Sequence, residues 1–581
     1  MITPPIPGVL LRLRAETDPG RVIFTYVADD AAPVQDVTYA ALVTRASAIA
    51  GELVALGLRG RPVLLVYRAG PAFSEAFFGA LLAGAIAVPV PVPQFGAQWD
   101  RLERVARDCD PGALLTTAAL ATSLESRIEP GAALRRASWL VTDGLEGSPS
   151  GDLPVVAPSD LALLQYTSGS TAEPRGVAVT HANLACNAST IVADLPVPSR
   201  EPAVSWLPHF HDMGLIAGLV TPVYRDCQSV LMAPMAFLQR PLRWLETISR
   251  FRAQTSGAPN FAYGLCVRAA EGVDLQGLDL SSWDVAYVGA EPVRRSTLET
   301  FAMRFAPHGF DARALTPCYG MAEATLLVTS KRKGTHPTWH GVSRAGVEQG
   351  LALPSEDPAA LPLVGCGVPV TATDVRIVDP VRRAAVPPMH VGEVWVSGPQ
   401  VARGYWRPGA DDPFGWHLDD AGDGPFLRTG DLAFMTVDGE LVFVDRLKDL
   451  VIVNGQNHVC HDLELTAGAS HALLSPDACI VCGIEAGERT VIAVIAELPV
   501  ASAGQAGEVA QAIRAALLAG HSLPAHAVAF VGPRKLSRTT SGKLQRRLTA
   551  ARLQAGDLRT IAWIGEALPP LDTSSHVALS P

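Results

Sequence analysis

Three common signatures are missing from this sequence of 581 residues. Its nine cysteines are scattered, so they form neither a disulfide framework nor the paired spacing of a zinc site. There is no long basic run, and the net charge of −10 argues against nucleic acid as the main partner. The P-loop signature G-x-x-x-x-G-K-S/T is also absent, because Ser537 replaces its first glycine and Leu544 follows Gly542 and Lys543. A P-loop kinase or ATPase is therefore disfavoured.

We expect neither a membrane-spanning run nor a signal peptide in this sequence. Prolines interrupt the most apolar segment, residues 76–93, which we interpret as a buried helix followed by an edge-like strand. Near the N-terminus, Arg12 and Arg14 follow the short apolar piece instead of preceding it. We therefore expect a soluble cytoplasmic protein.

The composition fits a globular chain of two or more domains, with 48% hydrophobic and 18% charged residues. Short apolar runs alternate with amphipathic stretches, which predicts an α/β fold with mostly parallel sheets in a large N-terminal domain. Candidate strands are at residues 61–67, 111–117, 138–143, 161–168, 228–234 and 284–290, and a candidate helix is at 74–84.

The pattern changes between residues 394 and 453, where strand formers and a turn at Asp438 and Gly439 predict a β-rich subdomain. A smaller α+β segment follows, with strand candidates at 478–484 and 490–498 and a helix at 507–521. We place the boundary near residues 446–450. The expected domains are 1–447 and 448–560, and the last residues, 561–581, resemble a disordered tail.

Three polar or cysteine-containing segments have plain structural interpretations. Residues 331–362 are rich in Gly and Pro and predict a long surface loop, although long loops also form lids and partner contacts. The His- and Cys-containing group at residues 458–462 lacks a second ligand pair for zinc and predicts a polar loop. Cys479 and Cys482 lie in an apolar run, which indicates a buried strand and not a redox or metal site.

A turn rich in hydroxyl groups follows the apolar run at 161–168. It contains Thr167, Ser168, Gly169, Ser170 and Thr171. Backbone N–H groups and hydroxyls in such a turn can bind a phosphate, and Arg175 would add a charge-assisted donor. Composition alone supports a phosphate site and a plain polar turn equally.

His209, His211 and Asp212 lie among apolar residues in the segment 205–215. A metallohydrolase would need further ligands at defined spacing, and none is evident in the sequence. The default interpretation is a pocket wall or a core histidine.

Two more turns of small residues end candidate strands. The first contains Gly289, Ala290 and Glu291, and the second contains Tyr319, Gly320, Met321 and Glu323. An aromatic face can stack on a base, and a carboxylate beside phosphates fits Mg²⁺ better than direct contact. Taken alone, each turn is better interpreted as an ordinary strand end.

Three charged residues further along the chain each have a functional and a purely structural interpretation. Asp431 and Arg446 could hold the hydroxyls of a ribose, or they could form a surface salt bridge. Lys543 lies in a flexible basic segment, where lysines are usually only solvated.

These segments occur together and in order, and the ordered set resembles the adenylate-forming superfamily of acyl-CoA synthetases, peptide-synthetase adenylation domains and luciferases. The matching motifs are TSGSTAEPRGV, GAEPV, YGMAEAT, TGDL, DRLKDLVIVNG and SGKLQRR. Within the superfamily, LLQYTSGST, SWLPHFHDMGLIAGL, SGAPNFAYGLCVRA and RLKDLVIVNGQNH resemble the fatty acyl-AMP ligases. Residues 331–362 lie about where that family has its insertion.

The resemblance implies ATP-dependent activation of a fatty acid to an acyl-adenylate, with release of pyrophosphate. The acyl group would then pass to the 4′-phosphopantetheine arm of an acyl carrier protein for polyketide, nonribosomal peptide or lipid biosynthesis. Positioning and charge neutralisation are the main catalytic tasks, because two anions must approach each other.

The resemblance also implies roles for single residues. The turn at 167–171 and Arg175 would hold the ATP phosphates, with Thr171 and Glu323 on Mg²⁺. The adenine would be framed by Gly289, Ala290, Glu291, Tyr319, Gly320 and Met321. Asp431 and Arg446 would hold the ribose.

The catalytic residues implied are Lys543, Glu323 and His211. Lys543 would bridge the acyl carboxylate and the α-phosphate, and His211 would line the acyl pocket near that carboxylate. Lys448 would be the hinge about which a small mobile C-terminal domain swings between the two half-reactions.

The sequence departs from the family pattern at Ala172, where glycine is usual, at Arg175, where lysine is usual, and within residues 457–464. Two other hypotheses stay open: an acyl-CoA synthetase, and a catalytically silent homologue that only binds nucleotide or acyl chain.

Overall fold

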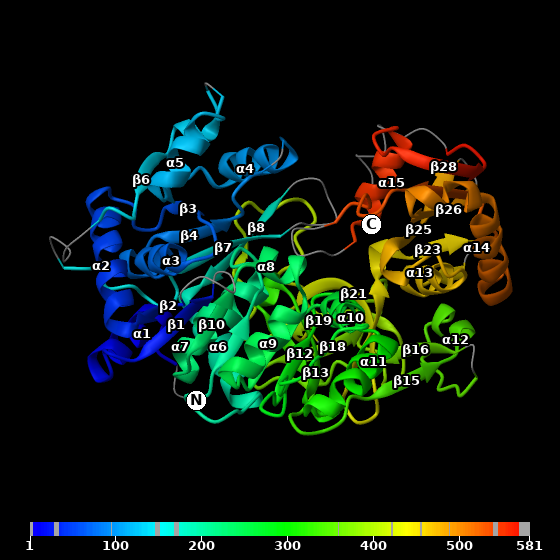
Figure 1. The fold of residues 1–581 in the computed structure, drawn as a ribbon, viewed down its shortest axis with the longest axis horizontal. Coiled ribbons are helices and arrows are strands. Elements are labelled where there is room, and N and C mark those ends of the chain that lie inside the picture. Colours follow the sequence, from blue (N-terminus) through cyan, green and yellow to red (C-terminus); the bar gives the residue numbers. More distant parts are fainter. Residues whose placement is uncertain are drawn as a thin grey trace.

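The computed structural model describes residues 4–27, 34–94, 96–129, 131–145, 152–167, 174–357, 360–419, 422–453, 456–486, 489–538 and 544–568. Figure 1 shows a large body and, at its upper right, a smaller C-terminal unit coloured orange to red. The predicted α/β class is confirmed, with a β-rich subdomain and a small α+β unit.

The largest sheet places six parallel strands side by side. Its order is β17 (Val368–Pro369), β14 (Leu327–Ser330), β13 (Leu315–Gly320), β12 (Val285–Val288), β11 (Thr255–Ala258), β9 (Ala203–Ser205), β10 (Ser229–Met232), β1 (Val22–Val27) and β2 (Gln35–Thr38). The strands from β13 to β1 are parallel to one another, and β2, β14 and β17 are antiparallel additions at the edges.

A second sheet is mixed. Its order is β20 (Gly404–Tyr405), β8 (Arg175–Thr180), β7 (Leu161–Thr167), β4 (Ile86–Val90), β3 (Pro62–Val66), β5 (Ala113–Thr116) and β6 (Ser138–Val141). The prediction of an edge-like strand after residue 85 is wrong, because β4 lies between β3 and β7. All five of its residues are buried, as is typical of a central parallel strand covered on both faces.

The β-rich subdomain is an antiparallel sheet of β18 (Asp374–Val378), β19 (Gly392–Ser397), β21 (Leu427–Met435) and β22 (Leu441–Arg446). The predicted turn at Asp438 and Gly439 joins β21 to β22. The segment 331–362 is not simply a loop: it contains β15 (Trp339–Val342), α12 (Arg344–Glu348) and the start of β16 (Leu361–Val364), and β15 pairs with β16.

The small unit holds β25 (Cys479–Ala486), β26 (Arg489–Glu497), β27 (Ala527–Val531) and β28 (Thr560–Gly565) in one sheet, and β23 (Val451–Val453) pairs with β24 (Gln456–His458). Cys479 and Cys482 lie in β25, as predicted. The predicted start of a tail at residue 561 is wrong, because β28 pairs antiparallel with β27. Residues 569–581 lie outside the described residues.

The helices of the large body are α1 (Pro7–Thr17), α2 (Tyr39–Ala55), α3 (Pro71–Ala83), α4 (Gly96–Cys109), α5 (Ala118–Glu125), α6 (His181–Asp194), the π-helix η2 (Met213–Val220), α7 (Thr221–Arg225), α8 (Pro234–Gln239), α9 (Leu242–Phe251), α10 (Asn260–Ala269) and α11 (Arg295–Phe305). The small unit adds α13 (Cys460–Ala469), α14 (Ala506–His521) and α15 (Arg546–Gln554). The predicted polar loop at 458–462 is wrong, because α13 begins at Cys460 and its first residues are buried.

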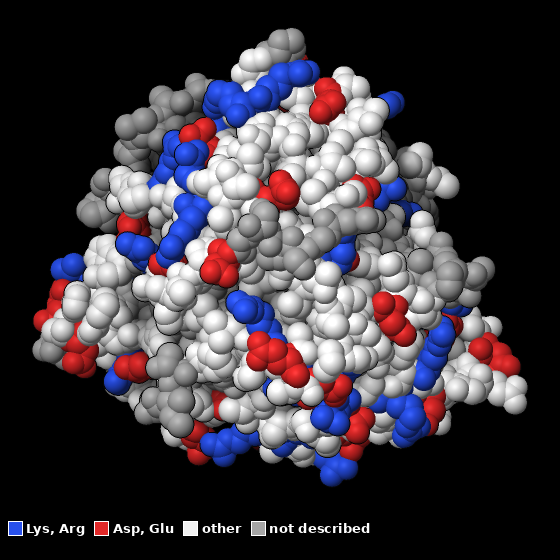
Figure 2. All heavy atoms as spheres, turned by 90° about the vertical axis from the view of Figure 1, so that its left-hand side faces the viewer, with Lys and Arg blue, Asp and Glu red and all other residues white. Residues whose placement is uncertain are grey.

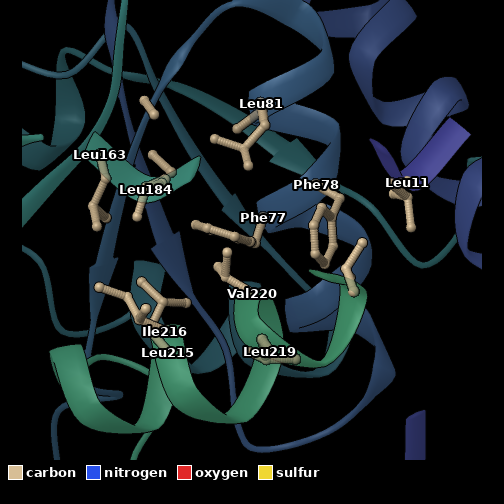
Figure 3. Packing of buried hydrophobic residues seen from close by; sticks show 14 of the residues in the cluster. Leu11, Phe77, Phe78, Leu81, Leu163, Leu184, Leu215, Ile216, Leu219 and Val220 are labelled. Atoms are coloured by element: carbon tan, nitrogen blue, oxygen red, sulfur yellow. The ribbon is translucent and has the colours of Figure 1, made fainter. Parts of the chain in front are cut away.

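A layer of helices lies between the two large sheets. Figure 3 shows Leu215, Ile216, Leu219 and Val220 of η2 beside Phe77 of α3, and these residues belong to one buried cluster. The opposite face of the seven-stranded sheet packs against α4 and α5. The opposite face of the nine-stranded sheet packs against α8 to α11. η2 therefore packs between the two sheets, with these apolar side chains toward α3 and with Gly218 against Ser205 of β9.

The surface at the left of Figure 1 is shown in Figure 2, where acidic and basic side chains are interspersed over most of the face and basic ones are densest toward its upper edge. Among the described residues, no helix is both long enough and apolar enough to span a membrane.

Candidate functional site

A cleft of about 2530 Å³ lies between the carboxyl ends of the parallel strands, the β-rich subdomain and the small unit. Most predicted site residues line it: Thr167, Arg175, His211, Ala290, Glu291, Tyr319, Gly320, Met321, Glu323, Asp431, Arg446 and Lys448. Ser168, Gly169, Ser170, Thr171 and Lys543 lie outside the described residues. One cleft thus gathers side chains from motifs that are spread along the whole chain.

Asp431 is held on both of its oxygens. The Tyr319 hydroxyl donates to Oδ2 at 2.8 Å, and Arg446 Nε donates to Oδ1 at 3.1 Å. Asp431 and Arg446 face each other across β21 and β22, which is why they meet. The adjacent Asp431 carboxylate, more than any other group, raises the pKa of Arg446, and burial raises the pKa of Tyr319. Asp431 is buried, whereas the Arg446 side chain is 54% exposed, so the pair lies at the surface of the cleft with only its carboxylate covered.

Glu323 and Arg175 are connected through a residue that the sequence did not reveal. The Tyr405 hydroxyl donates to Glu323 Oε1 at 2.9 Å, and the Arg175 guanidinium lies 5.3 Å from the centre of the Tyr405 ring. Burial raises the pKa of Glu323, whereas the Tyr405 hydrogen bond lowers it. Glu323 Oε2 accepts no hydrogen bond from the part of the chain that the structure describes.

Thr167 and Arg175 are cross-strand partners, so they close the two ends of the turn that joins β7 to β8. The intervening residues 168–173 are outside the described range. Beside this turn, Gln165 of β7 donates from Nε2 to the carbonyl of Phe210 at 2.8 Å and so fixes the segment that carries His211.

The turn after β12 is tight. Ala290 has a φ of +69°, and a side chain at Gly289 would come within 2.9 Å of the Cys318 sulfur. Glu291 Oε1 accepts the backbone N–H of Phe261 at 2.6 Å, at the first turn of α10. This oxygen therefore positions α10 against the turn.

The two histidines of the 205–215 segment differ. His211 Nδ1 lies 2.6 Å from Asp212 Oδ1 at the cleft, and Asp212 also accepts the N–H of Met213 at the start of η2. His209 is half-buried with its ring centre 3.8 Å from that of Phe73, and burial lowers the pKa of His209 to about 4. His209 therefore packs against α3 with its Nε2 unpaired among the described residues, and His211 lines the cleft.

Lys448 lies in the short helix Leu447–Asp449, between the two bodies. Arg546 of α15 anchors this connection: it pairs with Glu464 at 2.6 and 2.7 Å and with Asp449 at 3.0 Å. No local sequence pattern indicates this cluster, because its members are far apart in the chain.

The segment 331–362 contacts the small unit through two ion pairs. Arg344 of α12 donates to both oxygens of Asp462 in α13, at 2.5 and 2.8 Å. Glu348 Oε1 lies 3.1 Å from His458 Nδ1. Figure 1 shows α12 directly below α13.

Comparisons with known proteins agree with this arrangement. Residues 11–406 match the family described as AMP-binding enzyme. The medium-chain fatty acid–acyl carrier protein ligase JamA of Moorena producens is 37% identical over 563 residues, which cover 94% of this chain and 95% of that protein. A long-chain-fatty-acid–AMP ligase of Mycobacterium marinum is 36% identical over 564 residues, with 92% and 95% covered. This chain therefore belongs to the AMP-binding enzyme family.

The small unit and the whole fold have their own counterparts. Residues 448–562 match the AMP domain of Disco-interacting protein 2-like proteins. The crystal structure of a fatty acyl-adenylate ligase from L. pneumophila, solved with acyl adenylate and pyrophosphate, is similar with a TM-score of 0.73 and 32% identity. The match covers 96% of this chain and 98% of that one.

Proposed function

We propose that this protein is a fatty acyl-AMP ligase that activates a fatty acid with ATP and passes the acyl group to an acyl carrier protein. In the first step a carboxylate oxygen of the acid attacks the α-phosphorus of ATP, and pyrophosphate leaves. The observation that carries the proposal is the convergence of Tyr319, Asp431, Arg446 and Glu323 on one cleft. The similarity to ligases named for the same chemistry supports it.

The nucleoside would be held by the Tyr319–Asp431–Arg446 group. A carboxylate whose two oxygens are already oriented can accept hydrogen bonds from ribose hydroxyls without reorganisation. The Tyr319 ring lies beside Phe443, with ring centres 6.5 Å apart, and would form part of the adenine wall with the turn at 289–291.

The phosphates would be bound between Arg175 and the small-residue turn at 167–171; Thr167 and Arg175 pair with each other and both line the cleft. Mg²⁺ would be held by Glu323, together with Thr171 of that turn. The donor set fits, because Mg²⁺ prefers carboxylate oxygens and Glu323 Oε2 is not used by a described donor. When bound, the ion would neutralise phosphate charge.

Lys543 would approach the acyl carboxylate and the α-phosphate from the small unit, and His211 would line the acyl cavity near that carboxylate. The short helix containing Lys448 would be the hinge between a domain of residues 1–447 and one of 448–560, extended through β28. Such a hinge would allow one cleft to serve both half-reactions. We propose the cytoplasm as the site of action, where fatty acids and carrier proteins meet.

The test is exchange of labelled pyrophosphate into ATP, screened over fatty acids of increasing length. Acid-dependent exchange supports adenylation, and its absence with every acid would favour a silent binding homologue. Acyl transfer is then measured with a phosphopantetheinylated carrier protein and, in parallel, with coenzyme A. Steady formation of acyl-CoA would make the chain an acyl-CoA synthetase instead.

A further inference from the structure

The cleft does not end at the carboxyl edge of the nine-stranded sheet. Ser205 at the end of β9 lines it, but so do Ala203, Ser229 and Thr255, the first residues of β9, β10 and β11. The strand register places these three in one row, because Ala203 pairs with both Ser229 and Thr255. A branch of the cavity therefore runs along the sheet face toward the amino ends of the strands.

The other wall of this branch comes from helices. Ala217 of η2 and Thr221, Pro222 and Arg225 of α7 line it, together with Leu195 after α6. The apolar residues of η2 labelled in Figure 3 are engaged with α3. That packing leaves the opposite side of η2 and α7 to face the sheet and the cavity.

The far end of the branch contains a buried charge without a counter-charge. Arg225 is only 6% exposed. Its Nη1 donates to Thr255 Oγ1 and its Nη2 donates to the Leu195 carbonyl, both at 3.0 Å. Its Nε–H has no hydrogen-bond partner, and Arg225 forms no ion pair within the ranges that the structure describes. Burial lowers the pKa of Arg225.

A second orphan group lies one helical turn away. Thr221 is 4% exposed, and its hydroxyl also lacks a partner among the described residues. A threonine in a helix usually bonds back to a carbonyl of the preceding turn. Here the backbone N–H of Thr221 bonds to Ile216, five residues earlier, so the local geometry is that of a π-helix. The hydroxyl therefore has no hydrogen-bond partner on its own helix, and its oxygen is covered at the edge of the cavity.

Both polar groups would be destabilising if the cavity held only hydrocarbon. An unsatisfied buried polar group costs about 1–3 kcal/mol, and an uncompensated buried charge costs more. A plain alkyl chain that reached this point would leave the Arg225 Nε–H and the Thr221 hydroxyl unpaired. A carboxylate at this end of the cavity would neutralise the guanidinium, and a small movement of the two side chains would let it accept from both groups.

We infer that the far end of this cavity recognises a second carboxylate, so that the preferred acids are α,ω-dicarboxylic acids. The inference rests on the proposed function, because it takes the branch as the binding site of the acyl chain. The near carboxylate would be adenylated at the cleft, while the distal one would pair with Arg225 and Thr221. The intervening methylene groups would lie among Ile191, Leu195, Ala217 and Leu327.

The experiment compares kcat/KM for pyrophosphate exchange among monocarboxylic, ω-hydroxy and dicarboxylic acids of matched length. At one chain length we expect the dicarboxylic acid to be favoured by about 10- to 100-fold, the scale of a charged hydrogen bond. Arg225→Met should remove this preference while plain fatty acids are still adenylated. Arg225→Lys, which keeps the charge, should retain part of it.

Thr221→Val provides a milder variant of nearly equal volume, and it should lower the preference without lowering the thermal unfolding temperature. A wild-type protein that favours monocarboxylic acids at every length would overturn the inference while leaving adenylation intact. An equal preference for ω-hydroxy acids, or a preference that persists in Arg225→Met, would also overturn it. If no acid at all supported exchange, the proposed function itself would fail.

Discussion

The Tyr319 hydroxyl donates to Asp431 Oδ2 at 2.8 Å, although 112 residues separate the two side chains in the sequence. Asp431 is 5% exposed and has Arg446 on its other oxygen. Three motifs from β13, β21 and β22 therefore share one carboxylate. The orientation of that carboxylate is set by the protein before a nucleotide binds, which lowers the ordering cost of binding.

Asp431→Asn should weaken ATP binding, because an amide replaces one of the two carboxylate oxygens. Hydrogen bonds to charged groups contribute about 1.5–3 kcal/mol, so the KM for ATP should rise by about 10- to 100-fold with a smaller change in kcat. Pyrophosphate exchange at varied ATP measures both. The control is Asp419→Asn, an exposed carboxylate that pairs with Arg383 at 2.8 Å. An unchanged KM in Asp431→Asn would contradict the ribose role.

Tyr405→Phe should shift the acid limb of the pH–rate profile. Burial raises the pKa of Glu323, and the Tyr405 hydroxyl lowers it by bonding to the charged form. Without that hydroxyl the pKa of Glu323 rises further. If ionised Glu323 is required, activity is lost as pH falls through this pKa, so the loss should begin at a higher pH in the variant.

The measurement is kcat/KM for adenylation across the acid limb, at saturating Mg²⁺. Tyr224→Phe is the matched control, since its hydroxyl donates to the Pro5 carbonyl away from the cleft. Coincident acid limbs in wild type and Tyr405→Phe would show that Glu323 need not be ionised for the rate measured.

Lys543→Ala should slow adenylation by about 10²–10³-fold, the scale for losing one charge contact that forms in the transition state. The reason is that Lys543 is proposed to bridge the carboxylate and the α-phosphate as they approach. Single-turnover formation of acyl-AMP measures the step directly. Lys333→Ala is a suitable control, because Lys333 pairs with Asp284 on the surface at 3.1 Å. Acyl-AMP formation at the wild-type rate would exclude the role.

Asp445→Asn should stabilise the protein at alkaline pH and not at acidic pH. Burial raises the pKa of Asp445 to about 6 from an ordinary value of 3.8. The folded state therefore holds the proton more tightly than the unfolded state, and stability is lost as pH rises between these two values. Asparagine cannot ionise, so the variant does not lose stability in this way as pH rises. The gain should be absent near about pH 4 and complete above about pH 7.

Thermal unfolding of both proteins at several pH values provides the measurement. Asp423→Asn, at an exposed position, should show no pH-dependent difference from wild type. A gain in Asp445→Asn that is the same at every pH would indicate an effect on packing and not on ionisation.

The local sequence pattern was sufficient to predict most of the strands. The runs at 61–67, 161–168 and 284–290 became β3, β7 and β12, because each combines an apolar core with turn residues at its ends. The segment 458–462 was misjudged, since its polar residues are buried through partners from elsewhere: Arg344 pairs with Asp462 across 118 residues. A sequence contains no local sign of such a partner.

In the candidate site, too, some features could be predicted from local sequence and others depend on partners that are distant in the chain. That Glu323 and Asp431 line one cleft could be predicted because the resemblance assigned both to one site, although Asp431 lies in the antiparallel strand β21 and not at the end of a parallel strand. Tyr405 and Arg546 could not, because their functions depend on pairing with β8 and with Glu464, which are distant in the chain. The orphan atoms of Arg225 and Thr221 are likewise visible only in three dimensions.

The ion pairs of α12 have a mechanical consequence. Arg344–Asp462 and Glu348–His458 lie about one helical turn apart, and both connect the large body to the small unit. A relative rotation of the two units would therefore have to break both of these ion pairs, and the ion pair of Arg294 with Asp477 as well.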